Sequence, residues 1–194
     1  MRFLIIIIIL ALCIFSVGHF DIERFYKHIF LGNNEENTIN SKNLVYRNGL
    51  GYEKSQRAPF TGKVTGSEHG YLKNGIWNGR YISYYNNGKI KYWGNYSGAR
   101  KEGLWKSFRS NGQIIFEGNY KNGLKDGQWN FYHLFGSNLQ ECTNYKNGKK
   151  NGRHQSFWGD GNLRQKGSYK NGKPSGLWIF YYTDGITEKN KKTY

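Results

Sequence analysis

Apolar and polar residues alternate in short runs along most of the chain, and Asn-Gly or Asp-Gly pairs separate many of these runs. In the run 113–120, alternate positions form one apolar set, which consists of Ile114, Phe116, Gly118 and Tyr120. A period of two is typical of half-buried strands, and Asn-Gly and Asp-Gly adopt the positive φ angles of tight hairpin turns. The pattern therefore predicts an antiparallel meander in which each turn reverses the chain.

The alternating runs belong to a longer repeat of about 24 residues. The glycines that open the units are Gly79, Gly103, Gly127, Gly152 and Gly176, with spacings of 24, 24, 25 and 24. Such a period predicts stacked supersecondary units, none of which can bury its apolar side alone. We expect the extra residue of the third unit to be absorbed as a bulge around residues 140–143.

Equivalent positions of successive units should form ladders of aromatic side chains. The three predicted ladders are Tyr96, Tyr120, Tyr145 and Tyr169; Tyr81, Trp105, Trp129, His154 and Trp178; and Tyr84, Phe108, Tyr132, Phe157 and Tyr181. Stacked rings bury a large area at little rotamer cost, so Trp105, Trp129 and Trp178 are candidate binding residues that we interpret as structural. His154 is interpreted as a substitute for tryptophan. Glycines two residues before a ladder tyrosine should let a neighbouring ring lie on the backbone; these are Gly94, Gly118 and Gly167.

The spacing G-x-W-x-x-(Y/F)-x-x-x-G followed by G-x-Y-x-x-G resembles the MORN repeat, in the variant found in bacterial YwqK-like proteins. The segment 59–63, Pro-Phe-Thr-Gly-Lys, stands where that family often begins its first hairpin. The resemblance covers residues 44–185 and implies a twisted ribbon of β-hairpins. It departs at His154, where tryptophan is usual, and at Cys142 or Thr143, where glycine is usual. Many members bear the name of antitoxin, which implies a partner toxin.

These observations predict an all-β fold, an elongated single-layer antiparallel meander of stacked MORN-type hairpins. The expected organisation is a signal peptide or N-terminal anchor at 1–18, a polar linker at 19–43, the repeat domain at 44–188 and a solvated basic tail at 189–194.

The first residues predict export. Residues 3–17 form a continuous apolar run behind Met1-Arg2, and small residues at 16 and 18 suit cleavage before His19. Fifteen apolar residues are few for a spanning helix, which needs about 20. A cleaved signal is therefore favoured over a retained anchor at residues 3–17, and lipidation of Cys13 is a third alternative. The expected location is periplasmic or extracellular, with anchoring to the membrane by residues 3–17 as the alternative to cleavage.

The formal charge of +16 has two interpretations. A basic face could bind an anionic partner, and the turn lysines Lys121, Lys146 and Lys170 recur at one repeat position, so they would form a row along one edge. Alternatively, lysines in turns keep strand edges soluble. An unknown protein, a glycan or an anionic membrane surface is the expected partner, and export disfavours nucleic acid.

Catalytic chemistry finds little support in the sequence. The histidines are scattered without metal-ligand spacing, and no nucleophile-base arrangement, paired-carboxylate signature or phosphate loop appears. We expect no enzyme activity, no cofactor, no metal and no small-molecule substrate. The favoured function is a non-enzymatic exported binding or scaffold module at the cell envelope. The alternative is an antitoxin or immunity-type protein that masks a cognate toxin.

Overall fold

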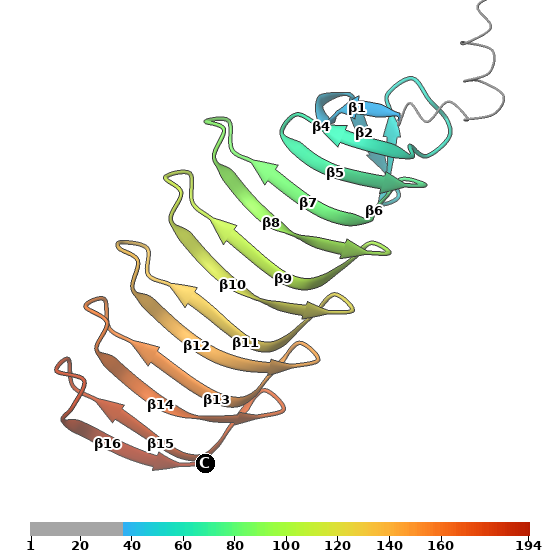
Figure 1. Cartoon of the computed structure of the whole chain (residues 1–194). Helices are drawn as coiled ribbons and strands as arrows, with labels where there is room; N and C mark the ends of the chain where they lie inside the picture. Colours follow the sequence, from blue (N-terminus) through green and yellow to red (C-terminus); the bar gives the residue numbers. More distant parts are fainter. Residues whose placement is uncertain (1–36) are drawn as a thin grey trace, which may run out of the picture. The chain divides into compact units, whose positions relative to one another are not determined.

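A computed structural model describes residues 37–194, which form a long sheet of hairpins and a small two-stranded sheet (Figure 1). The predicted signal peptide, Cys13 and residues 19–36 of the predicted linker lie outside the described residues. The N-terminal elements are β1 (Thr38–Asn40), the 3-10 turn η2 (Ser41–Asn43), β2 (Leu44–Arg47), β3 (Leu50–Glu53), β4 (Gly62–Thr65), β5 (Glu68–Lys73) and β6 (Ile76–Trp77). The repeat strands are β7 (Gly79–Tyr84), β8 (Ile90–Ser97), β9 (Arg100–Phe108), β10 (Ile114–Lys121), β11 (Leu124–Tyr132), β12 (Leu139–Lys146), β13 (Lys149–Phe157), β14 (Leu163–Lys170), β15 (Lys173–Tyr181) and β16 (Glu188–Thr193).

The long sheet confirms the predicted meander, because β7 to β16 are neighbours in chain order and pair antiparallel. The N-terminal end differs from the prediction. There β1 pairs parallel with β4, so the 14-stranded sheet is mixed, and β2 and β3 form a separate two-stranded sheet. Local alternation and turn residues could not predict a parallel pair between strands that are more than 20 residues apart.

The folded region extends beyond both predicted boundaries. Residues 38–43, which the sequence assigned to a linker, form β1 and η2, and Ile39 is buried. Most of the predicted basic tail, 189–193, belongs to β16, which pairs with β15 through contacts such as Trp178 opposite Lys192. The lysine-rich composition concealed this strand because all its side chains are exposed and it lies at the sheet edge, where lysines are common. Within residues 37–194 no helix has the length and hydrophobicity to span a bilayer.

Successive strands of the repeats are joined alternately by two kinds of turn, one kind at each edge of the sheet where strands end. At one edge, Asn122 and Gly123 have φ angles of 52° and 81°, and the same geometry recurs at 147–148 and 171–172. Two successive positive φ angles define the type I′ turn that suits the right-handed twist of a hairpin. The unit-opening Gly127 also has positive φ, 73°, and lies where the β10–β11 register shifts. The recurring glycine thus marks a bulge.

The extra residue of the third unit lies in the opposite turn, so the prediction that a bulge at residues 140–143 absorbs it is wrong. In that turn the His133 amide donates to the Asn138 carbonyl, whereas in the preceding unit the Arg109 amide donates to the Gln113 carbonyl. The loop is therefore one residue longer, while the register shift beside it, between Phe131 and Tyr132, occurs in every unit. An exposed loop accommodates an insertion without disturbing the strand pairing.

Two different cores support this sheet. At the N-terminal end, Ile39, Leu44, Val64 and Leu72 form an aliphatic cluster with Phe60 and Trp77 packed against it. Phe60 belongs to the Pro-Phe-Thr-Gly-Lys segment, and its neighbour Gly62 approaches Asn37 so closely that an added Cβ would collide with the Asn37 carbonyl. Along the repeats the buried side chains are instead mostly aromatic.

Candidate binding surfaces

The central ladder is buried along its whole length. Its exposed fractions are Tyr81 8%, Trp105 1%, Trp129 0%, His154 2% and Trp178 4%. Two neighbouring pairs of the ladder are in ring contact: the ring centroids of Trp105 and Tyr81 lie 6.0 Å apart, and those of Trp178 and His154 lie 5.2 Å apart. The three tryptophans proposed as binding candidates therefore have almost no surface to offer a partner.

Every ladder tryptophan lies on the backbone of a glycine in the preceding strand. A Cβ built on Gly118 would stand 2.3 Å from Cδ2 of Trp129, and Gly94 and Gly167 make equivalent approaches to Trp105 and Trp178. The predicted role of these glycines is confirmed. The Trp129 indole N–H donates to the Asn119 carbonyl at 3.0 Å, so the buried polar group is satisfied.

Lysines lie over the rings of two of these tryptophans. Lys101 Nζ lies 4.3 Å from the centroid of the Trp105 ring, and Lys125 Nζ lies 4.3 Å from that of Trp129. Each lysine comes four residues before its tryptophan in the same strand, and the bulge lies between the two residues. The bulge therefore brings the lysine side chain over the ring. Burial among aromatic rings lowers the pKa of Lys101 and of Lys125 below the ordinary lysine value. These contacts stabilise the ladder as cation–π pairs, and sequence reasoning missed them, although the lysines share the 24-residue period.

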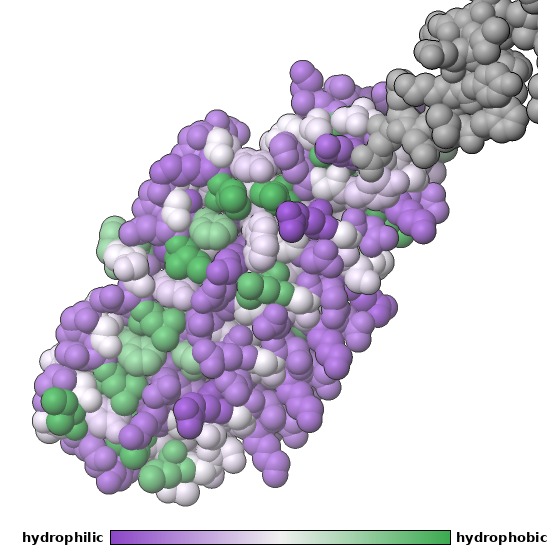
Figure 2. All heavy atoms as spheres, in the orientation of Figure 1, coloured by the Kyte–Doolittle hydropathy of each residue, from purple (hydrophilic) through white to green (hydrophobic). Residues whose placement is uncertain are grey.

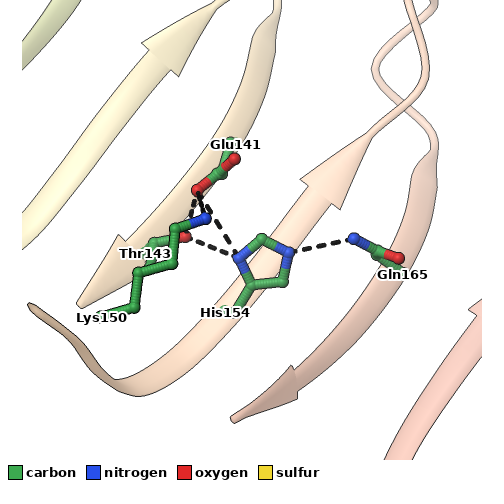
Figure 3. Close-up of polar contacts among 5 residues, drawn as sticks. All are labelled: Glu141, Thr143, Lys150, His154 and Gln165. Carbon is green, nitrogen blue, oxygen red and sulfur yellow. Dashed lines mark hydrogen bonds and ion pairs between the residues drawn. The ribbon is translucent and has the colours of Figure 1, made fainter. Parts of the chain in front are cut away.

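Between the third and fourth units a polar network, drawn in Figure 3, replaces this arrangement. Thr143 stands at the glycine position and His154 at the tryptophan position, with 2.6 Å between Thr143 Oγ1 and His154 Nδ1. Thr143 Oγ1 also donates to Glu141 Oε1 at 2.8 Å, and Lys150 Nζ lies 2.7 Å from the same carboxylate oxygen. Gln165 Nε2 lies 3.1 Å from His154 Nε2. His154 thus occupies the ladder as predicted, with polar partners that no sequence pattern indicated.

Burial and the neighbouring charges shift the pKa values of His154 and Glu141 in opposite directions. Burial lowers the pKa of His154 below its ordinary value of 6.5, and the Glu141 carboxylate opposes only part of this effect. Burial alone would raise the pKa of Glu141, but hydrogen bonds from Lys150 and Thr143 outweigh it and lower that pKa. The network therefore holds an ionised carboxylate, a lysine cation and a neutral imidazole near neutral pH.

The predicted row of turn lysines lies at the type I′ edge of the sheet. Lys121, Lys146 and Lys170 end β10, β12 and β14, and all three side chains are exposed. In Figure 2 the corresponding edge, at the right of the repeat region, is largely hydrophilic, whereas hydrophobic patches lie over the middle of the strands. The structure thus places these three residues on one edge, as the repeat register requires.

The row contains more cations than the sequence reasoning identified. Lys146 stands directly opposite Lys149, and Lys170 directly opposite Lys173, across their turns. Among residues 37–194, none of these four side chains forms an ion pair with a carboxylate. Like charges placed opposite each other on antiparallel strands are destabilising. The edge therefore keeps a local repulsion that charged partners within the described chain do not relieve.

The opposite edge is held by side chains that cross from one loop to the next. The Tyr85 hydroxyl donates to the Phe108 carbonyl at 2.8 Å, and His133 Nε2 lies 3.1 Å from the Phe157 carbonyl oxygen. The Trp158 indole N–H donates in the same way to the Tyr182 carbonyl. These residues share one repeat position but not one chemical type, so sequence comparison between units did not reveal them. Among the described residues, no cluster of three or more His, Cys, Asp or Glu side chains could hold a metal ion.

Comparison with known proteins supports the repeat assignment. The family model of the MORN repeat variant matches residues 77–97, 101–122 and 150–171. The matches fall on stacked hairpins and omit residues 123–149, which include the longer loop and Thr143. The search among curated proteins finds no match. The fold and these matches define a repeat protein with MORN-type units, a class whose extended surfaces suit a binding module.

Proposed function

We propose that this chain is a non-enzymatic, exported repeat protein that acts as a binding or scaffold module at the cell envelope. The edge of the sheet that carries Lys121, Lys146, Lys149, Lys170 and Lys173 binds an anionic surface. The aromatic ladder holds the strands in register and so keeps these lysines in a regular row. Because three stacked units carry a lysine at the same turn position, each of these units adds a positive site, and weak contacts combine into one multivalent interaction.

The observation that supports the proposal is the pair of lysines opposed at each of two turns, 146 with 149 and 170 with 173. Scattered lysines at exposed turns are enough for solubility, and placing them opposite each other adds repulsion without a gain to the fold. An anionic partner would relieve the repulsion. Features that break a local rule without compensation in the fold often mark functional sites.

The test replaces Lys121, Lys146 and Lys170 with Gln and measures co-sedimentation of the protein with anionic phospholipid vesicles at two salt concentrations. Each lysine near an anionic surface contributes about 1 kcal/mol, so the triple variant should bind on the order of 100-fold more weakly. Wild-type binding should also fall with added salt.

The matched control replaces three exposed lysines of the N-terminal block, Lys42, Lys54 and Lys63, and so removes the same charge. Its binding should stay close to that of the wild type. Equal loss in both variants would mean that net charge alone attracts the protein, and absence of wild-type binding at low salt would overturn the anionic-surface proposal.

Export is tested separately by cell fractionation with mass measurement of the recovered chain. The proposal expects the protein outside the cytoplasm, shortened to begin near His19 if the signal is cleaved. A full-length soluble cytoplasmic species would rule out the envelope role while leaving the edge-binding measurement unaffected.

A further inference from the structure

The Thr143 and His154 substitutions depend on each other. We call each pair of a ladder ring and the residue whose backbone it lies on a rung; the other rungs are Gly94 with Trp105, Gly118 with Trp129 and Gly167 with Trp178. In these rungs a Cβ on the glycine would lie 2.2 to 2.3 Å from the indole ring, a distance that real atoms do not reach. A threonine at the glycine position, residue 143, therefore excludes a tryptophan at the ladder position of the next strand, residue 154. The smaller imidazole fits, and its Nδ1 lies 2.6 Å from the threonine hydroxyl oxygen. The third rung is thus a coherent polar alternative to the glycine–tryptophan rung.

The contacts also fix where the proton of the imidazole lies. Thr143 has one hydroxyl proton, which it donates to Glu141 Oε1 at 2.8 Å. The 2.6 Å contact must then be a donation from His154 Nδ1–H to the hydroxyl oxygen. Nε2 carries no proton and accepts from the Gln165 amide at 3.1 Å. In this arrangement both ring nitrogens have hydrogen-bond partners while the imidazole is neutral (Figure 3).

A second proton on His154 would disturb this arrangement. Nε2–H would face the Gln165 amide N–H₂, so that amide would have to turn and present its oxygen. The added positive charge would lie on a ring that is only 2% exposed and that Lys150 repels. The charged groups facing the ring are Glu141 on β12, whose Oε1 lies 3.8 Å from Nδ1, and Lys150 on β13, which already pairs with that carboxylate. From β14 and β15 come Tyr169, edge-on at 5.3 Å, and Trp178 at 5.2 Å, neither of which offers a negative charge at acidic pH.

We infer that the Thr143–His154 rung is an acid-sensitive joint: protonation of His154 loosens the packing between β12, β13 and β14 and uncouples the hairpins on either side. A repeat sheet has no other connection to bypass a weakened rung, because each unit contacts only its neighbours. Figure 1 shows β13 and β14 as the link between the longer N-terminal part of the sheet and β15–β16.

The expected direction follows from the protonation states. Burial lowers the pKa of His154 in the folded chain, so the unfolded chain takes up the proton first as pH falls. The stabilisation by this rung is complete above about pH 6.5 and declines below it. Glu141 stays ionised in this range because its own pKa is lowered from 4.5.

The test compares amide hydrogen exchange of the full chain at about pH 7.5 and about pH 5. The ratio of protection in β13–β14 to that in β9–β10 of the same sample removes the intrinsic pH dependence of exchange. This ratio should fall on acidification, because the unfolded or opened chain takes up the proton on His154 more readily than the folded chain does. A ratio that stays constant in the wild type would overturn the inference.

Two variants distinguish a histidine effect from general acid sensitivity. The double variant Thr143→Gly, His154→Trp rebuilds the rung of its neighbours, and His154→Gln keeps polar contacts but cannot titrate. Both should show a pH-independent ratio, and either one suffices if the other fails to fold. An acid response equal to that of the wild type in the folded variants would contradict the role of His154.

Discussion

The buried ladder and the exposed turn row share one period of about 24 residues but have opposite surroundings. Trp105 and Trp129 are 1% and 0% exposed and lie on glycine backbone, whereas Lys121, Lys146 and Lys170 extend from an edge where no carboxylate pairs with them in residues 37–194. Recurrence therefore identifies equivalent places in a repeat but does not say what each place does. The neighbours of a residue decide whether it stabilises the sheet or remains available to a partner.

The ladder should account for the largest stability effects. Trp105→Ala removes a buried ring together with its indole hydrogen bond to the Asn95 carbonyl and its cation–π contact with Lys101. Truncation of a buried tryptophan costs about 3 to 5 kcal/mol, so the denaturation midpoint should fall strongly. Equilibrium denaturation measures this. If stability were unchanged while binding to anionic vesicles disappeared, the ring would be a binding anchor and the comparison would fail.

A smaller loss is expected from filling the space under a ring. Gly118→Ala adds one carbon 2.3 Å from Cδ2 of Trp129, so the indole must shift away from its hydrogen-bond partner, the Asn119 carbonyl. Overpacking of this kind costs about 1 to 3 kcal/mol. Gly159→Ala is the matched control because an added Cβ there meets nothing within 4 Å and no positive φ restricts it. Equal stability of the two variants in thermal denaturation would show that the ring does not depend on the glycine.

The same contrast explains which features the sequence predicted. Strand alternation, Asn-Gly turns and the glycine under a tryptophan ring follow from local chemistry that recurs in most units, so they appeared as a pattern. The parallel β1–β4 pair, the β16 strand and the network around Glu141 each occur once. A feature that occurs once leaves no periodic trace, and its contacts come from residues that are distant in the chain or unremarkable in type.

The crossing hydrogen bonds at the loop edge were missed for a different reason. Tyr85, Arg109, His133 and Trp158 all donate or can donate a polar hydrogen to a carbonyl of the next unit. The requirement at this position is therefore a long side chain with a donor, and four residue types meet it. A search for identical residues cannot detect a requirement that is defined by donor capacity alone.

The smallest expected effect concerns the backbone of the turns and has the opposite sign. Ala99 has a φ of 67° in the only repeat hairpin of the described residues that carries Gly-Ala in place of Asn-Gly. A left-handed conformation costs an ordinary residue roughly 1 to 2 kcal/mol, and glycine avoids this cost while losing about 0.5 to 1 kcal/mol of chain entropy. Ala99→Gly should therefore stabilise the protein by about 0.5 kcal/mol. The reverse change, Gly123→Ala at a φ of 81°, should destabilise by a similar amount, since an added Cβ meets only ordinary contacts with Arg100. Opposite shifts of the denaturation midpoint in the two variants would show that local backbone geometry governs the turns, while ring packing governs the ladder. Shifts of the same sign would contradict that division.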